Sequence, residues 1–182
     1  EGVTIMTASS RDQYAVEDRI TGHGVFTELL IQGLLGGAAD VGGNITPASL
    51  YSFVDQSLGA WEQRPLFKTN ISRFLPIRKI KPKVPIEVLR KISDYFQNPD
   101  SEYPLDPSFE FTNNPEYQIE IKEPYAKDVN ISKFKELQLY ESVGLIEPVD
   151  EEHMYFAAMN SKSCRLTPLG LHYWKLSKDK RF

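Results

Sequence analysis

Hydrophobic positions in the N-terminal part of the chain follow the order strand, helix, helix, strand. Residues 2–8 (GVTIMTA) are apolar or β-branched at consecutive positions, which is typical of a strand covered on both faces. Apolar residues then recur at helical spacing over 26–34, and Thr46-Pro47 marks a second helix with an N-cap and a proline at its first position. The stretch RPLFKTN (64–70) predicts a returning edge strand. This order predicts an α/β layer in which helices pack on a sheet.

Glycine and proline mark where these elements end. The GLLGG stretch stops the first helix, and either Gly36 or Gly37 is expected to take the left-handed conformation of a C-cap. The stretch RKIKPKVP (78–85) holds four basic residues and two prolines. This composition favours an exposed linker, with an extended edge of the first domain as the alternative. The sequence therefore predicts a domain over 1–77, a linker over 78–85 and a second domain over 86–182.

The second domain is expected to combine helices with a small sheet. A short helix is predicted after Pro85, and residues 98–128, rich in Asn, Pro and acidic residues, are expected to be mostly irregular, with a short strand in YQIEIK (117–122). The stretch ISKFKELQLYESVG predicts a helix that ends at Gly144.

Two short apolar runs near the C-terminus flank a polar turn. MYFAAM (154–159) and CRLT (164–167) stand on either side of NSKS and predict a β-hairpin. Thr167-Pro168 repeats the N-cap and proline that start a helix. A helix, a two-stranded wing and a closing helix indicate a compact, winged-helix-like α+β domain.

Composition narrows the functional classes. A chain of 182 residues that is 41% hydrophobic and 25% charged can bury a core, and its net charge of −4 argues against non-specific nucleic-acid binding. A single cysteine, Cys164, allows no internal disulfide and no multi-cysteine zinc site, and favours a reducing, cytoplasmic compartment. No apolar run is long enough to span a bilayer, and no cofactor or metal is expected. Because the first strand starts almost directly at Glu1, we expect further chain upstream.

Several segments in the N-terminal part occur in the order found in one peptidase family. TIMTASSRDQYAVED, GHGVFTELLIQGLLGGAAD, NITPASLYSFVDQSL and QRPLFKTN together resemble the C-terminal part of caspase-like cysteine peptidases, especially their bacterial and metacaspase-like branch. The resemblance covers about residues 2–77, and the later YPLDPSFE and GLIEP…HMYFAAMNSKSCRLTPLG…YW are similar to C-terminal extensions of bacterial members. It implies that a specificity strand and its supporting helices are present here.

The family's chemistry uses a Cys–His dyad, in which the histidine activates a thiolate that attacks the scissile carbonyl. The resemblance places both dyad residues upstream of residue 2, so this chain alone is predicted to be inactive and to need the upstream catalytic half as its partner. His23 lies between two glycines and is similar to the family's catalytic His-Gly pair, but it stands downstream of the specificity strand. It is therefore interpreted as a loop or helix-start residue.

The resemblance also implies a substrate-binding segment over Ala8–Asp18. Ser9, Ser10, Asp12 and Glu17 are the candidate contacts for a peptide or protein substrate. Acidic residues here resemble metacaspases, which cleave after Arg or Lys, and charge-assisted hydrogen bonds would recognise such side chains. Arg11 departs from this pattern, since it can occupy the site of the pocket acid, pair with Glu17 or favour an acidic substrate. A solvated turn is the alternative interpretation of the whole segment.

Three other features are candidate sites with a simpler structural explanation. Cys164 would need a nearby base to act as a nucleophile and is interpreted as a core residue of a short strand. ADVGGNIT (39–46) offers only Asp40 and Asn44 as side-chain oxygen ligands, so a plain turn is expected there rather than a calcium loop. A basic cluster in the tail allows DNA contact, whereas Asp150 and its acidic neighbours oppose it. The cluster comprises Lys162, Arg165, Lys175, Lys178, Lys180 and Arg181.

Three hypotheses follow from these observations. The first is the C-terminal portion of a caspase-like endopeptidase with a regulatory or partner-binding tail, for which the resemblance also implies a role in bacterial defence or cell death. The second is a non-enzymatic winged-helix module that binds DNA or protein on an α/β scaffold. The third is a degenerate protease fold that has lost its dyad.

Overall fold

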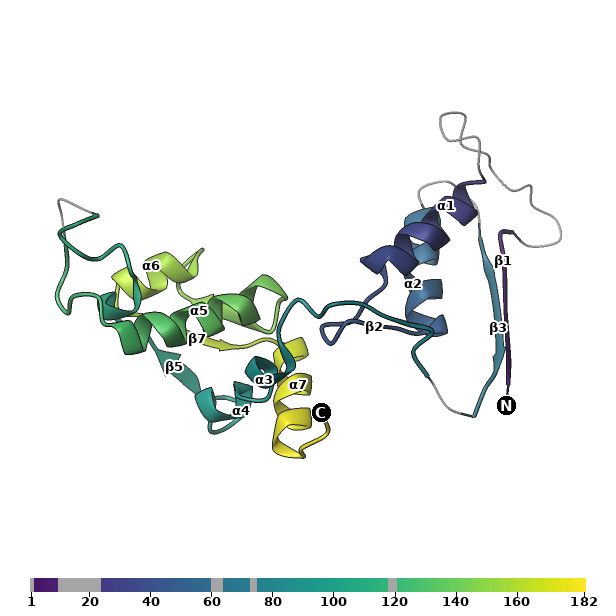
Figure 1. Cartoon of the computed structure of the whole chain (residues 1–182). Helices are drawn as coiled ribbons and strands as arrows, with labels where there is room; N and C mark the ends of the chain where they lie inside the picture. Colours follow the sequence, from purple (N-terminus) through teal and green to yellow (C-terminus); the bar gives the residue numbers. More distant parts are fainter. Residues whose placement is uncertain (1, 10–23, 60–63, 73–74, 118–120) are drawn as a thin grey trace. The chain divides into compact units, whose positions relative to one another are not determined.

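The structure is a computed structural model that describes residues 2–9, 24–59, 64–72, 75–117 and 121–182 (Figure 1). The chain is a mixed α/β protein that divides into two compact units, Glu1–Lys83 and Val84–Phe182. The division falls within the basic, proline-rich segment 78–85. No helix in the described ranges is long and apolar enough to cross a membrane.

The first unit packs two helices against one side of a two-stranded sheet (Figure 1). Its elements are β1 (Val3–Thr7), α1 (Val25–Gln32), the π-helical turn η1 (Gly33–Gly37), β2 (Asn44–Ile45), α2 (Pro47–Leu58), β3 (Leu66–Asn70) and β4 (Arg78–Lys79). β1 and β3 are antiparallel, with Val3 opposite Asn70 and Thr7 opposite Leu66. The predicted order of strand, helix, helix and strand is confirmed.

Local signals explain where the helices of this unit begin and end. Thr46 caps α2 by accepting a hydrogen bond from the backbone N–H of Ser49 at 3.1 Å, while the Ser49 hydroxyl accepts one from the Thr46 N–H at 3.0 Å. At the other helix, Gly36 takes a φ of 138°, which a side chain would oppose. The prediction of a glycine stop is confirmed, with Gly36 rather than Gly37 in the positive-φ conformation.

Close packing of η1 on α2 depends on a missing side chain. A Cβ at Gly33 would stand 2.5 Å from Cδ1 of Leu50, so a side chain there would force Leu50 to move. The approach buries two apolar clusters, one around Val54 and Leu58 and one around Ile45. These clusters form the core of the first unit.

The segment that follows β3 belongs in part to the first unit. Arg78 and Lys79 pair with Ile45 and Asn44, and the Ile80 N–H donates to the carbonyl of Gly43 at 2.8 Å. Residues 78–80 therefore form an extended edge of the first unit, which is the second of the two interpretations of this segment.

The second unit holds helices around a three-stranded antiparallel sheet in the order β5, β7, β6. Its elements are α3 (Ile86–Leu89), α4 (Ile92–Tyr95), β5 (Glu102–Pro104), the 3-10 turn η3 (Pro107–Phe109), α5 (Asp128–Ser142), β6 (Ile146–Val149), α6 (Met154–Met159), β7 (Ser163–Leu166) and α7 (Pro168–Lys178). The predicted end of α5 near Gly144 and the Thr167 N-cap of α7 are confirmed, since Gly144 has a φ of 72° and Thr167 accepts from the Gly170 N–H at 3.0 Å. Residues 118–120 of the predicted YQIEIK strand lie outside the described ranges.

The predicted hairpin of MYFAAM and CRLT is wrong. MYFAAM forms helix α6, and β7 pairs with β6 instead, with Glu147 opposite Arg165. A six-residue apolar run does not distinguish strand from helix by periodicity. Burial decides here: Met154, Ala157 and Ala158 are buried at helical spacing, so α6 closes onto the sheet as an insertion between the two strands.

Candidate functional site

The inner face of the β1–β3 sheet is fixed by packing on the helices. Met6 packs against the cluster around Ile45 and lies opposite Phe67 in the sheet. The Phe67 ring stacks on Tyr51 of α2 with centroids 4.8 Å apart. The hydroxyls of Thr4 and Thr69 share a hydrogen bond of 3.0 Å across the strands. These contacts determine which residues of β1 face outward.

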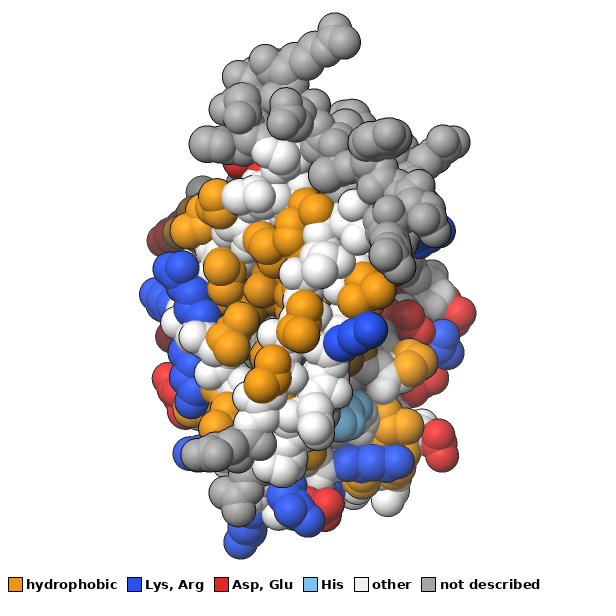
Figure 2. Space-filling view, turned by 90° about the vertical axis from the view of Figure 1, so that its right-hand side faces the viewer, with side chains coloured by type: hydrophobic (Ala, Val, Ile, Leu, Met, Phe, Trp, Pro, Cys, Tyr) orange, Lys and Arg blue, Asp and Glu red, His pale blue; other side chains and the backbone are white. Residues whose placement is uncertain are grey.

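The outer face of β1 is apolar and exposed. Val3 is 64% and Ile5 50% exposed, and Figure 2, which views the β1–β3 side of the first unit, shows hydrophobic side chains gathered over this region. Within the described chain β1 pairs with β3 alone, so its second edge also carries unpaired backbone groups. The prediction of a strand covered on both faces is therefore wrong for the described chain, because only the helix side is covered.

The candidate substrate segment starts directly at the end of β1. Ser9 is half-buried in a bend, and its carbonyl accepts a hydrogen bond from the Thr7 hydroxyl at 3.1 Å. The chain is described again from Gly24, whose carbonyl accepts the first hydrogen bonds of α1 from Thr27 and Glu28. The remaining candidates, Ser10, Arg11, Asp12, Glu17, Asp18 and His23, lie outside the described residues.

Cys164 is a core residue, as expected. It is fully buried in β7, and burial, followed by the carboxylates of Glu141 and Glu102, raises the pKa of its thiol to about 12. A thiol with this pKa is almost entirely protonated at neutral pH and cannot attack a carbonyl. The interpretation of Cys164 as a packing residue is confirmed.

Iodoacetamide is expected to modify Cys164 at least ~100-fold more slowly in the native protein than in urea, because both access and thiolate formation are blocked. Mass spectrometry of timed samples at pH 8 measures both rates. Similar rates in the two states would contradict the buried position of the thiol.

The ADVGGNIT stretch is a turn. The Asp40 carboxylate accepts from the Asn44 N–H at 2.8 Å and also contacts the Asn44 side-chain amide, and Gly43 takes a φ of 79°. Asp40 is thus used within the turn, as expected. Across the described ranges no group of three or more His, Cys, Asp or Glu residues is arranged to hold a metal ion.

Part of the basic cluster in the tail is neutralised by neighbouring groups. Arg165 is paired with Glu147 at 2.8 Å, and Lys162 lies 3.8 Å from Asp150. The Lys178 ammonium lies over the ring of Trp174, 5.5 Å from its centroid. The two ion pairs reduce the positive charge that a phosphate backbone would encounter, whereas the ring contact leaves Lys178 charged.

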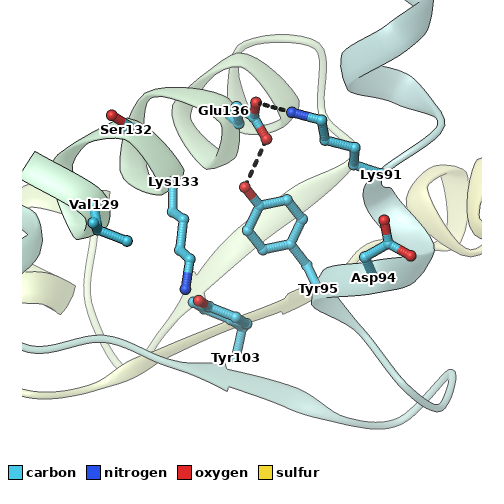
Figure 3. A pocket seen from close by; sticks show the side chains of 8 residues that line it. All are labelled: Lys91, Asp94, Tyr95, Tyr103, Val129, Ser132, Lys133 and Glu136. Atoms are coloured by element: carbon cyan, nitrogen blue, oxygen red, sulfur yellow. Dashed lines mark hydrogen bonds and ion pairs between the residues drawn. The ribbon is translucent and has the colours of Figure 1, made fainter.

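A second candidate site lies in the second unit, in an open pocket of about 620 Å³ between α5 on one side and α4 and β5 on the other (Figure 3). The Lys91 ammonium contacts one oxygen of Glu136 at 2.6 Å, and the Tyr95 hydroxyl donates to the other at 2.7 Å. Partial burial raises the pKa of Glu136, but the hydrogen bonds from Lys91 and Tyr95 outweigh it and hold that pKa below its usual range. No motif in the sequence marks this pocket, because its residues come from separate segments of the chain.

Comparisons with known proteins give no relative. No family model, no curated protein and no solved structure matches the chain. Functional inference therefore depends on the geometry described above and on the sequence resemblance.

Proposed function

We propose that this chain is the C-terminal portion of a caspase-like cysteine endopeptidase. In this proposal the first unit supplies the wall of the substrate groove, and the second unit is a winged-helix-like domain that regulates the enzyme or recruits a partner. The catalytic thiol and its histidine belong to chain upstream of β1, and this chain supplies the specificity segment that starts at Ser9.

The observation that carries the proposal is the exposed outer side of β1. A strand with apolar residues on one exposed face and an unpaired edge is suited to receive another strand and a covering layer. A catalytic half that pairs with β1 would cover Val3 and Ile5, and would place the residues after Ser9 at the end of the shared sheet. Such strand ends are where substrate sites of α/β proteins are commonly built.

The alternative of a DNA-binding module receives less support. Arg165 and Lys162 are engaged by acidic neighbours, and the chain has a net charge of −4. A gel-shift titration separates the hypotheses, because the DNA-binding module requires affinity that decreases steeply with salt. A degenerate protease would differ from the proposed enzyme only in the upstream chain. An intact His-Gly pair and a nucleophilic Cys segment there would show that the protein is an enzyme.

The test compares two charge substitutions in the protein that includes the upstream chain. Ile5→Asp places a carboxylate where the catalytic half would pack, so cleavage of a peptide library is expected to fall at least ~100-fold. Leu35→Asp, an equally polar change at a residue of η1 that is 66% exposed, should leave cleavage within about twofold.

The isolated 182-residue chain serves as the second arm of this test. Ile5 is half-exposed there, so Ile5→Asp should change its free energy of unfolding by about 1 kcal/mol or less, and the chain should cleave no peptide with or without the substitution. Peptide cleavage by the isolated chain, or equal losses from Ile5→Asp and Leu35→Asp, would contradict the proposal.

The same library tests which side chain the enzyme accepts before the cleaved bond. If Asp12 and Glu17 line the pocket, cleavage after Arg or Lys is expected, and Glu17→Gln should weaken it at least ~10-fold. Glu123→Gln, the same change at a glutamate of the second unit, is the matched control and should leave the preference unchanged. A strict preference for cleavage after Asp would overturn the basic specificity.

A further inference from the structure

The pocket between α5, α4 and β5 offers two hydrogen-bond donors that none of the described residues engages. Among the described residues, neither the Lys133 ammonium nor the Tyr103 hydroxyl has a hydrogen-bond or ion-pair partner. Figure 3 shows the Lys133 side chain reaching down from α5 toward the hydroxyl end of Tyr103 on β5. Two unused donors directed into one pocket form a receptor for an oxyanion.

The acidic residue at the centre of the pocket does not oppose an anion. Each oxygen of Glu136 already has a donor, one from Lys91 and one from Tyr95. The negative charge of Glu136 is therefore compensated by the ammonium beside it, and the charge of Lys133 remains available. Asp94 is exposed and lies on the other side of the Tyr95 ring from Lys133 (Figure 3). Because Asp94 repels an anion and Lys133 attracts it, the negative end of a ligand would lie beside Lys133.

The walls provide an apolar surface next to these donors. The rings of Tyr95 and Tyr103 meet edge to face, with centroids 5.4 Å apart at 69°, and Val129 is exposed at the mouth. Burial, followed by the nearby Cys164 and Asp106, raises the pKa of Tyr103, so its hydroxyl remains a donor. The volume of about 620 Å³ lies in the usual range of small-molecule pockets.

We propose that this pocket binds an organic carboxylate, whose charged group accepts hydrogen bonds from Lys133 and Tyr103 and whose apolar body packs on the Tyr95 ring. The site belongs to the second unit and is independent of the proposed protease function. It gives that unit a ligand of defined chemistry, a carboxylate with an aromatic or aliphatic body.

The test is a titration of the full chain with 2-naphthylacetate and with its neutral amide. The amide has the same shape without the charge, so the acid should bind at least ~10-fold more tightly. Lys133→Gln should weaken binding of the acid about 10-fold and Tyr103→Phe about threefold, and both should weaken binding of the amide by a smaller factor, because its carbonyl accepts only neutral-acceptor hydrogen bonds. Lys135→Gln removes the same charge from another exposed position of the same helix and should change the affinity less than about twofold.

Lys133→Arg provides a second variant that keeps the positive charge and should bind the acid within about threefold of the original chain. Circular dichroism of each variant verifies that α5 is retained. Equal affinities for acid and amide, no binding of the acid at about 10 mM, or equal losses from Lys133→Gln and Lys135→Gln would each overturn the proposal.

A carboxylate at the end of a peptide offers the same group as a free small molecule. N-acetyl-Gly-Gly-Phe and its C-terminal amide distinguish these sources. Tighter binding of the peptide acid than of 2-naphthylacetate assigns the pocket to a peptide terminus, and weaker binding assigns it to free small carboxylates. Both results require the loss in Lys133→Gln, and a peptide that binds equally well as acid and amide would contradict the assignment to its terminus.

Discussion

Replacing Gly170 with alanine is expected to destabilise the second unit by about 4 kcal/mol. Gly170 lies in the first turn of α7, where a Cβ would stand 1.7 Å from the carbonyl oxygen of Leu145 and 2.7 Å from its carbon. Backbone atoms cannot move aside as a flexible side chain does. To accept the methyl group, α7 must shift away from the chain that links α5 to β6.

That shift would also break the hydrogen bonds that hold the start of α7. The Thr167 hydroxyl accepts from the Gly170 N–H at 3.0 Å and donates to the carbonyl of Gly144 at 2.6 Å, while the Thr167 N–H donates to the Leu145 carbonyl at 3.0 Å. One residue thus joins the N-cap of α7 to the end of α5. The steric conflict and the loss of this junction add to each other.

Gly144→Ala is the matched control. Gly144 also lies at the junction and has a φ of 72°, but nothing stands within 4 Å of the position of a Cβ there. Its substitution should cost only about 1 kcal/mol, the penalty for a side chain at positive φ. Hydrogen exchange of α7 and β6 over a urea series measures both losses. A loss from Gly170→Ala no larger than that from Gly144→Ala would contradict the close approach.

The elements predicted correctly from the sequence are those with local signals at their ends. The Thr-Pro pairs at 46–47 and 167–168 start helices because the threonine hydroxyl caps the first turn and proline fits its first position. Neither effect depends on contacts with distant parts of the chain. Gly36 and Gly144 end helices for an equally local reason, a positive φ.

Elements whose form depends on distant contacts were predicted less well. MYFAAM was expected to be a strand, and helix α6 forms because Met154, Ala157 and Ala158 bury one face together. The partner of β7 was misassigned for the same reason, since the sequence between the strands contains a helix rather than a tight turn. The prediction that β1 is covered on both faces was also wrong. Consecutive apolar residues indicate that a strand is covered on two faces, but not whether the residues that cover the second face belong to the same chain.

The candidate sites show the same division between local and distant information. The Asp40 turn and the buried Cys164 follow from short segments and were predicted. The pocket between α5, α4 and β5 was not predicted, because Lys91, Tyr103 and Lys133 are widely separated in the sequence and are ordinary residue types for a surface. Only the packing of α5 beside α4 and β5 brings them together.

Asn113→Asp is expected to destabilise the second unit by about 3 kcal/mol at neutral pH. Asn113 is fully buried, and its side-chain amide N–H groups donate to the carbonyls of Pro107, Lys122 and Pro124 at 3.0, 2.8 and 3.2 Å, while its oxygen accepts from the Lys122 N–H at 2.9 Å. This one amide organises the irregular chain between η3 and α5. A carboxylate would direct an oxygen at three carbonyl oxygens, a repulsion that a buried site cannot relieve with water.

The pH dependence of Asn113→Asp distinguishes this repulsion from a loss of packing. The introduced carboxyl can donate to a carbonyl only when protonated, so folding raises its pKa above the ordinary value of about 3.9. Stability relative to the original chain is then greatest below the unfolded-state pKa and is lost as pH rises through the folded-state pKa. Asn114→Asp, the same change one residue away, should have little effect at any pH, because that side chain is partly exposed and already accepts from the Glu116 N–H at 3.1 Å. Urea unfolding at pH 4 and pH 7 measures these differences, and a loss from Asn113→Asp that is equal at both pH values would show that charge is not its cause.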